Sequence, residues 1–234
     1  SSAAAYVYKR QEINQLEGNV NSKVIGAMLI LGPLLTVLPW FALGTDTSEM
    51  APSEQITAIL AEAGTVEATS ILNVFGGIFM FAGLYFLARS LKSENTVSNH
   101  FSEIGGLLLL LCVPLWVVLV GAWLPAISEA EKFGNDVGAT IIASSTALQM
   151  GGILLVVGLF MLGISLTLLR KYKGIIGILF IIASVSAFID MVFEIDIMGM
   201  IGWMGMFLMI LVTCLLYTSP RPRDATLSRM PSSA

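Results

Sequence analysis

Long stretches of uncharged, apolar residues alternate with short polar segments along most of the chain. A helix needs about 20 apolar residues to cross the hydrocarbon core of a bilayer. Six stretches reach or approach this length, at residues 24–45, 68–90, 104–128, 139–169, 174–190 and 197–216. The fourth is long enough to begin outside the membrane, and the fifth is short. The pattern therefore predicts an all-α fold, a polytopic transmembrane helical bundle with six spans.

A shorter pattern of another kind lies between the first two predicted spans. In the stretch 52–63, Ile56 and Ile59 follow at helical spacing, and Glu54 and Glu62 provide a polar side. Such a segment is typical of a helix that lies in the membrane interface. We therefore expect a short amphipathic helix on the outer surface of the membrane.

The composition narrows the classes of function. Hydrophobic residues make up 56% of the 234 residues and charged residues only 12%, whereas about a quarter of a soluble domain is charged. The net charge of −4 offers no basic footprint for nucleic acid. Two cysteines and one histidine are too few for a disulfide framework or a His/Cys metal cluster. We therefore expect the lipid bilayer as a partner, no nucleic acid, no metal site and no cofactor.

Both ends of the chain resemble translated sequencing adapters. Residues 1–11 depart from the adapter only at Ala5 and Tyr6, and residues 214–234 depart from it only at Arg221 outside a short variable index. The alternative is a basic N-terminal arm and a Pro/Arg-rich tail. We expect a six-span domain at 12–213 between two adapter-derived segments, as a gene fragment whose natural ends are missing. This domain has seven basic and fifteen acidic residues.

The basic residues predict the orientation of the bundle. Six of the seven lie at one end of the predicted spans, namely Lys23, Arg89, Lys92, Arg170, Lys171 and Lys173. Only Lys132 lies at the other end. Because cytoplasmic loops carry an excess of Lys and Arg, we expect the N-terminus and the C-terminus in the cytoplasm.

Three carboxylates near the turn between spans five and six form a candidate proton or cation site: Asp190, Glu194 and Asp196. Asp190 and Glu194 are four residues apart and share a helix face if the helix continues through both. Span five has only 16 uncharged residues, about 24 Å of helix. Asp190 can therefore lie just inside the hydrocarbon edge, where a carboxylate indicates function. The alternative is a tight outer hairpin with all three acids in water.

A second set of polar residues lies within the predicted spans: Asn73 in the second, and Ser144, Ser145, Thr146 and Gln149 in the fourth. Such side chains can form hydrogen bonds between helices, which is their commoner role. They can also line a solute pathway. A polar cavity at mid-depth would favour the pathway, and a dry, packed centre would favour the structural role.

The six spans, the short loops and the outer helix resemble uncharacterised six-helix integral membrane proteins of bacteria and archaea. The resemblance extends over most of 23–213, and it implies a prokaryotic cell membrane as the location and no particular site residue. No Ser/His/Asp set, phosphate loop or HExxH motif favours an enzyme.

Two functions follow as expectations. The first is a non-enzymatic membrane protein of accessory or scaffold type. The second is a small proton- or cation-coupled secondary transporter or channel that uses the acidic cluster. The sequence leaves open a homo-oligomer or a partner membrane subunit.

Overall fold

The computed structural model describes residues 21–43, 50–91, 93, 95–170 and 174–218. All regular elements in these ranges are helices, which confirms the prediction of an all-α fold. The six longer helices are α2 (Ser22–Leu43), α4 (Ala63–Arg89), α5 (Thr96–Gly121), α8 (Gly152–Leu168), α9 (Ile175–Phe193) and α10 (Asp196–Thr218). The shorter elements are α3 (Pro52–Ala61), α6 (Trp123–Phe133), α7 (Asn135–Thr146) and the 3-10 helix η1 (Ala147–Gly151).

Several of these helices are long and apolar enough to cross a membrane. Five stretches meet this condition, namely Ala63–Arg89, Thr96–Phe133, Asn135–Leu168, Ile175–Phe193 and Asp196–Leu215. Ser22–Val37 in α2 is a shorter apolar helix. The prediction of membrane-length apolar helices is confirmed, and the count of six spans stays a prediction. The predicted adapter segments lie outside the described residues, apart from the end of α10.

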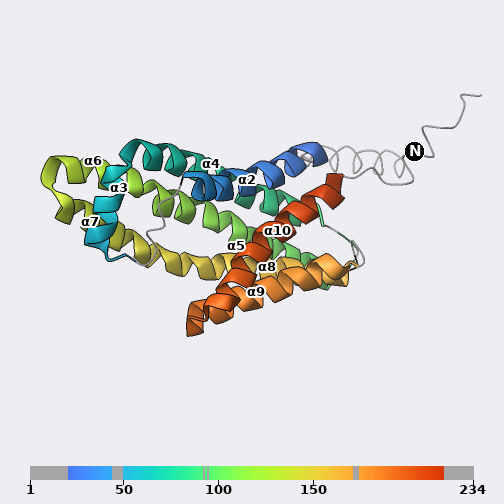
Figure 1. Ribbon diagram of the computed structural model, residues 1–234. Helices are drawn as coiled ribbons and strands as arrows, with labels where there is room; N and C mark the ends of the chain where they lie inside the picture. The colour runs from blue at the N-terminus through green and yellow to red at the C-terminus, as the bar shows by residue number, and fades with distance from the viewer. Residues whose placement is uncertain (1–20, 44–49, 92, 94, 171–173, 219–234) are drawn as a thin grey trace, which may run out of the picture.

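The six longer helices form a closed ring. Each contacts the next one along the chain, in the order α2, α4, α5, α8, α9 and α10, and α10 contacts α2 (Figure 1). The ring closes where Cys214 Sγ lies 3.0 Å from the carbonyl oxygen of Gly26, which joins the end of α10 to the start of α2. We call the end of the ring that carries Lys23, Arg89 and Arg170 the inner end, and the opposite end the outer end.

Fully buried side chains fill the ring toward its inner end. They come from five of its helices and include Leu29, Leu84, Leu109, Leu159, Leu162 and Phe180. Polar contacts at the same end join neighbouring helices. The hydroxyls of Ser98 in α5 and Ser165 in α8 are 2.9 Å apart and completely buried. The inner half of the bundle is therefore closely packed.

Neighbouring helices approach most closely at glycines. A Cβ atom at Gly32 of α2 would lie 2.6 Å from the Cα of Met80 in α4, closer than real atoms come. A Cβ atom at Gly202 of α10 would lie 2.5 Å from the backbone nitrogen of Ala187 in α9. Small residues permit such contacts, and van der Waals packing of this kind drives helix association in lipid, where the hydrophobic effect is absent.

The shorter helices form a layer at the outer end. Together α5 and α6 extend over 38 residues, about 57 Å of helix, which exceeds a hydrocarbon core of about 30 Å. Beyond the ring, α3, α6 and α7 lie together at one end of the molecule (Figure 1). They enclose a second apolar core of Ile56, Ile59, Ala126, Ile127, Ala130 and Ile142. We call these three helices the cap.

Two details differ from the expectations drawn from the sequence. The predicted surface helix forms as α3, but Ile56 and Ile59 are buried against α6 and α7, so its apolar side does not face a bilayer. The predicted fourth span, 139–169, largely coincides with the membrane-length stretch Asn135–Leu168, but residues Ala147–Gly151 within it form the 3-10 helix η1 in place of an α-helix. Two successive glycines weaken an α-helix and favour this break.

Gly32→Ala is expected to lower the free energy of unfolding by about 1–3 kcal/mol, because the added methyl group would overlap the backbone of Met80. Thermal unfolding in lipid nanodiscs measures the change. Gly64→Ala is the matched control, since nothing lies within 4 Å of its Cβ position. Equal unfolding temperatures for the two variants would contradict the close contact of α2 with α4.

Candidate functional site

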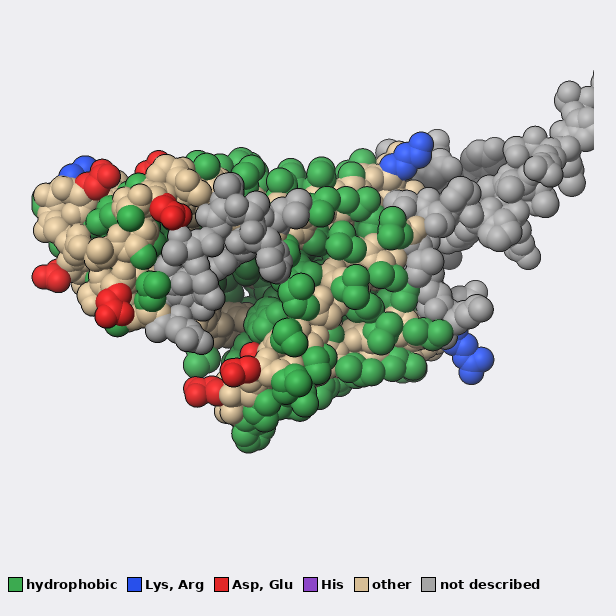
Figure 2. Space-filling view, viewed as in Figure 1, with side chains coloured by type: hydrophobic (Ala, Val, Ile, Leu, Met, Phe, Trp, Pro, Cys, Tyr) green, Lys and Arg blue, Asp and Glu red, His purple; other side chains and the backbone are tan. Residues whose placement is uncertain are grey.

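A cavity of about 500 Å³ opens in the outer half of the ring. Residues of α4, α5, η1, α8, α9 and α10 line it, so it lies on the axis that these helices surround. The buried side chains of Phe81, Cys112 and Leu155 form its floor, and Trp116 and Trp203 line its walls. We call this cavity the axial pocket. Figure 2 shows acidic side chains close to a hollow between the cap and the α9–α10 hairpin.

The local sequence accounts for the opening. The 3-10 helix η1 is narrower than an α-helix, and α8 begins only at Gly152. Gly151 and Gly152 line the axial pocket, and the side chains of Leu115 and Met191 lie against them where a Cβ atom would be. On the opposite side, α9 ends at Phe193 and α10 begins at Asp196, so both helices stop beside the mouth of the pocket.

The turn between α9 and α10 brings the three candidate carboxylates to the axial pocket. Asp190, Glu194 and Asp196 all line it. Asp190 lies in the last turn of α9 and is half-buried, whereas Glu194 and Asp196 are exposed. Glu194 ends α9 in the left-handed conformation, with φ 53° and ψ 47°, and its N–H donates to the carbonyl oxygen of Asp190 at 2.7 Å. The tight hairpin that the sequence left as an alternative is present, and its acids border a cavity.

The carboxylate of Asp190 lies directly against α10. A Cβ atom at Gly199 would be 2.6 Å from Asp190 Oδ2, so the absence of a side chain there leaves the space that this carboxylate occupies. Among the described residues, neither Lys nor Arg lines the axial pocket, and no ion pair involves Asp190. A half-buried carboxylate without a cationic partner is costly in a low-dielectric surrounding.

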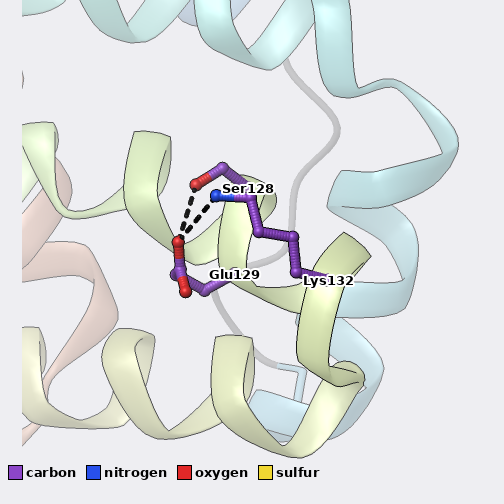
Figure 3. A network of polar contacts seen from close by, with 3 residues as sticks. All are labelled: Ser128, Glu129 and Lys132. Carbon is purple, nitrogen blue, oxygen red and sulfur yellow. Dashed lines mark hydrogen bonds and ion pairs between the residues drawn. The ribbon is translucent and has the colours of Figure 1, made fainter.

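The basic residue of the outer end is engaged in the cap. Lys132 Nζ lies 3.1 Å from Glu129 Oε1, one turn away on α6, and the hydroxyl of Ser128 donates to the same oxygen at 3.4 Å (Figure 3). Arg89, near the inner end, lies 5.8 Å from the ring centroid of Tyr85. These two cations therefore have contacts of their own, away from the acids of the axial pocket.

Asn73 reaches the axial pocket only through Trp116. Its buried side-chain nitrogen donates to the carbonyl oxygen of Thr36 in α2 at 3.2 Å. The indole N–H of Trp116 donates to Asn73 Oδ1 at 3.1 Å and to the Asn73 carbonyl oxygen at 3.2 Å. Asn73 thus links three helices and fixes a wall of the pocket. The sequence pattern does not single out Trp116, although a buried indole N–H needs an acceptor and Asn73 provides one at this depth.

The polar residues predicted in the fourth span do not stay together. Ser144 and Ser145 lie in α7 of the cap, and their hydroxyls donate to the carbonyl oxygens of Thr140 and Ile142 in the same helix. The side chain of Thr146 lies outside the described residues. Gln149 lies in η1 and lines the axial pocket. Only Gln149 of this set therefore joins the acidic cluster.

Comparisons of this chain with protein-family models, with curated proteins and with solved structures find no match. The residues of the axial pocket are therefore the basis on which a function is assigned.

Asn73→Leu is expected to lower the free energy of unfolding by about 1 kcal/mol, because it removes the bond to Thr36 and one of the two acceptors of Trp116. Thermal unfolding in nanodiscs measures the loss. Asn135→Leu is the control, since the Asn135 side chain bonds to Thr57 at an exposed position of the cap. An equal effect of both substitutions would argue against a structural role of Asn73 at the helix contact.

Proposed function

We propose that this protein is a multi-pass membrane protein that binds a cation in the axial pocket and acts as a small cation-coupled secondary transporter. The observation that carries the proposal is the half-buried carboxylate of Asp190 in a cavity on the ring axis, with no Lys or Arg in the described lining. A carboxylate within a membrane marks an ion or substrate pathway by default. A bound cation would supply the charge that this carboxylate lacks.

The position of Asp190 along α9 supports a site inside the membrane. It lies fifteen residues after Ile175, which corresponds to about 22 Å of helix at 1.5 Å per residue. A hydrocarbon core is about 30 Å thick. If α9 begins at the inner boundary of this core, Asp190 lies inside the hydrocarbon, near its outer edge.

The packing along the ring axis supports a carrier that is open to one side. Among the described residues, the carboxylates of the α9–α10 turn border the axial pocket at the outer end of the ring, and the buried side chains of Leu84, Leu109 and Phe180 fill the ring toward its inner end. Carriers expose a central site to one side of the membrane at a time. Pro114 lies in α5 between two residues of the pocket, Cys112 and Trp116, and a proline within a helix gives it a place to bend.

An accessory or scaffold protein has less support. That function predicts a dry, packed centre along the whole axis. The inner half of the ring fits this expectation, but the outer half contains the axial pocket with Gln149 and three carboxylates. The polar lining therefore favours binding of a solute.

The charge distribution supports an orientation. Lys23, Arg89 and Arg170 lie at the inner end. Figure 2 shows several acidic side chains on the cap. By the positive-inside rule, the inner end faces the cytoplasm, together with both termini, and the axial pocket opens to the outside of a prokaryotic cell.

The orientation predicts opposite labelling of two cysteine variants. In intact cells, a membrane-impermeant maleimide should label Glu131→Cys in the cap and should label Arg170→Cys only after the cells are lysed. Both positions are exposed, and the two cysteines already present in the chain, Cys112 and Cys214, are buried, so the unsubstituted protein measures the background labelling. Labelling of position 170 but not position 131 from outside would reverse the orientation.

Cation binding predicts a ligand-dependent rise in stability that needs Asp190. In nanodiscs, at least one chloride salt of sodium, potassium, calcium, tetramethylammonium or benzyltrimethylammonium should raise the unfolding temperature. The rise should be about 5 °C when the salt reaches about 100 times its dissociation constant. Asp190→Asn should abolish the rise, because it removes the charge that holds the cation.

Glu131→Gln is the matched control, since it removes one exposed carboxylate of the cap and reports the general effect of ionic strength. A rise of equal size in Asp190→Asn and Glu131→Gln for every salt would overturn the proposed function.

A further inference from the structure

We infer that the cation of the axial pocket is an organic ammonium ion with an apolar, ring-sized body. This inference rests on the proposed function and specifies its ligand. It follows from three observations: the volume of the pocket, the placement of its carboxylates, and the aromatic rings that form its walls and floor.

The volume fits an organic molecule. Binding sites for small organic ligands enclose about 300–1,000 Å³, and the axial pocket has about 500 Å³. A bare metal ion is held instead by several oxygen ligands that converge within about 2.0–2.6 Å of one point. Among the described residues, no group of three or more His, Cys, Asp or Glu side chains converges in this way. The three carboxylates thus offer negative charge along one side of a wide cavity.

The aromatic rings of the axial pocket provide the contacts for the organic part of the cation. Phe81 and Trp116 meet edge to face, with ring centroids 5.7 Å apart and an angle of 73° between their planes. The two bonds from the Trp116 indole to Asn73 hold this pair in place. Trp203 lines the pocket from α10. Faces of tryptophan rings attract organic cations, and this is the usual recognition of quaternary ammonium groups.

The acidic residues and the apolar residues lie at different depths in the axial pocket. Asp190, Glu194 and Asp196 come from the α9–α10 turn at the mouth, whereas Phe81 and Leu155 are buried at the floor. A ligand that satisfies both has its ammonium group near the carboxylates and its apolar body against the rings. An inorganic cation would leave the aromatic floor without a role.

The test is isothermal titration of the full chain in phosphatidylcholine nanodiscs with benzyltrimethylammonium, tetramethylammonium, sodium and calcium chlorides. Benzyltrimethylammonium should bind at least about tenfold more tightly than the other three cations, because it alone has a ring for the aromatic floor. Asp190→Asn should weaken its binding by about tenfold or more, and Trp203→Leu by about fivefold. Phe188→Leu is the aromatic control, since Phe188 is exposed on α9 and does not line the pocket.

Glu194→Gln is a second charge variant at an exposed position, where folding is not at risk, and it should weaken the binding of benzyltrimethylammonium in the same direction. Binding of sodium or calcium that depends on Asp190, without tighter binding of benzyltrimethylammonium, would overturn this inference and leave the proposed function standing. Binding of every cation that is unchanged in Asp190→Asn and Glu194→Gln would overturn both.

Discussion

Contact between helix backbones at glycine holds the ring together. In a bilayer, apolar side chains are surrounded by lipid tails that are as apolar as they are, so moving them into a helix contact removes no surface from water. Helices therefore associate through close packing and hydrogen bonds. Gly32 provides this contact between α2 and α4, and Gly202 provides it between α9 and α10. Two further contacts of this kind involve α8. A Cβ atom at Gly105 of α5 would lie 2.9 Å from the carbonyl oxygen of Gly158 in α8. A Cβ atom at Gly163 of α8 would lie 2.8 Å from the carbonyl oxygen of Gly177 in α9. The order of the helices around the ring therefore depends on where the sequence places glycine.

Around the axial pocket, the missing side chain of glycine makes space for another side chain instead of a neighbouring backbone. Gly77 in α4 is covered by the indole of Trp116, and Gly199 in α10 is covered by the carboxylate of Asp190. At these two positions, the space beside the glycine receives a side chain of the pocket rather than another backbone. Glycine therefore has two roles in this bundle: it lets backbones meet between neighbouring helices, and it gives space to two side chains that line the axial pocket.

The sequence predicts the helices well because a membrane requires long apolar runs. It offers the α9–α10 hairpin as one of two alternatives, because three acids end one run and begin the next. It does not predict the cap, because the spacing of Ile56 and Ile59 is the same whether that face meets lipid or protein. It also does not bring Asn73 and Trp116 together, since they are 43 residues apart and no local pattern encodes their contact. The split of Ser144 and Ser145 from Gln149 follows from the break at η1, which hydropathy alone does not reveal.

The membrane depth proposed for Asp190 has an electrical consequence. In the proposed orientation, a cation that reaches this carboxylate from outside has passed about 8 Å of a 30 Å hydrocarbon core, or roughly a quarter of it. One elementary charge that crosses a whole membrane changes its energy by about 2.3 kcal/mol per 100 mV. Occupancy of the site would therefore respond to membrane potential by about 0.6 kcal/mol per 100 mV, and an interior-negative potential would favour the bound state. Under the proposed function and orientation, the short length of α9 sets the share of the membrane field that a cation bound at Asp190 would experience.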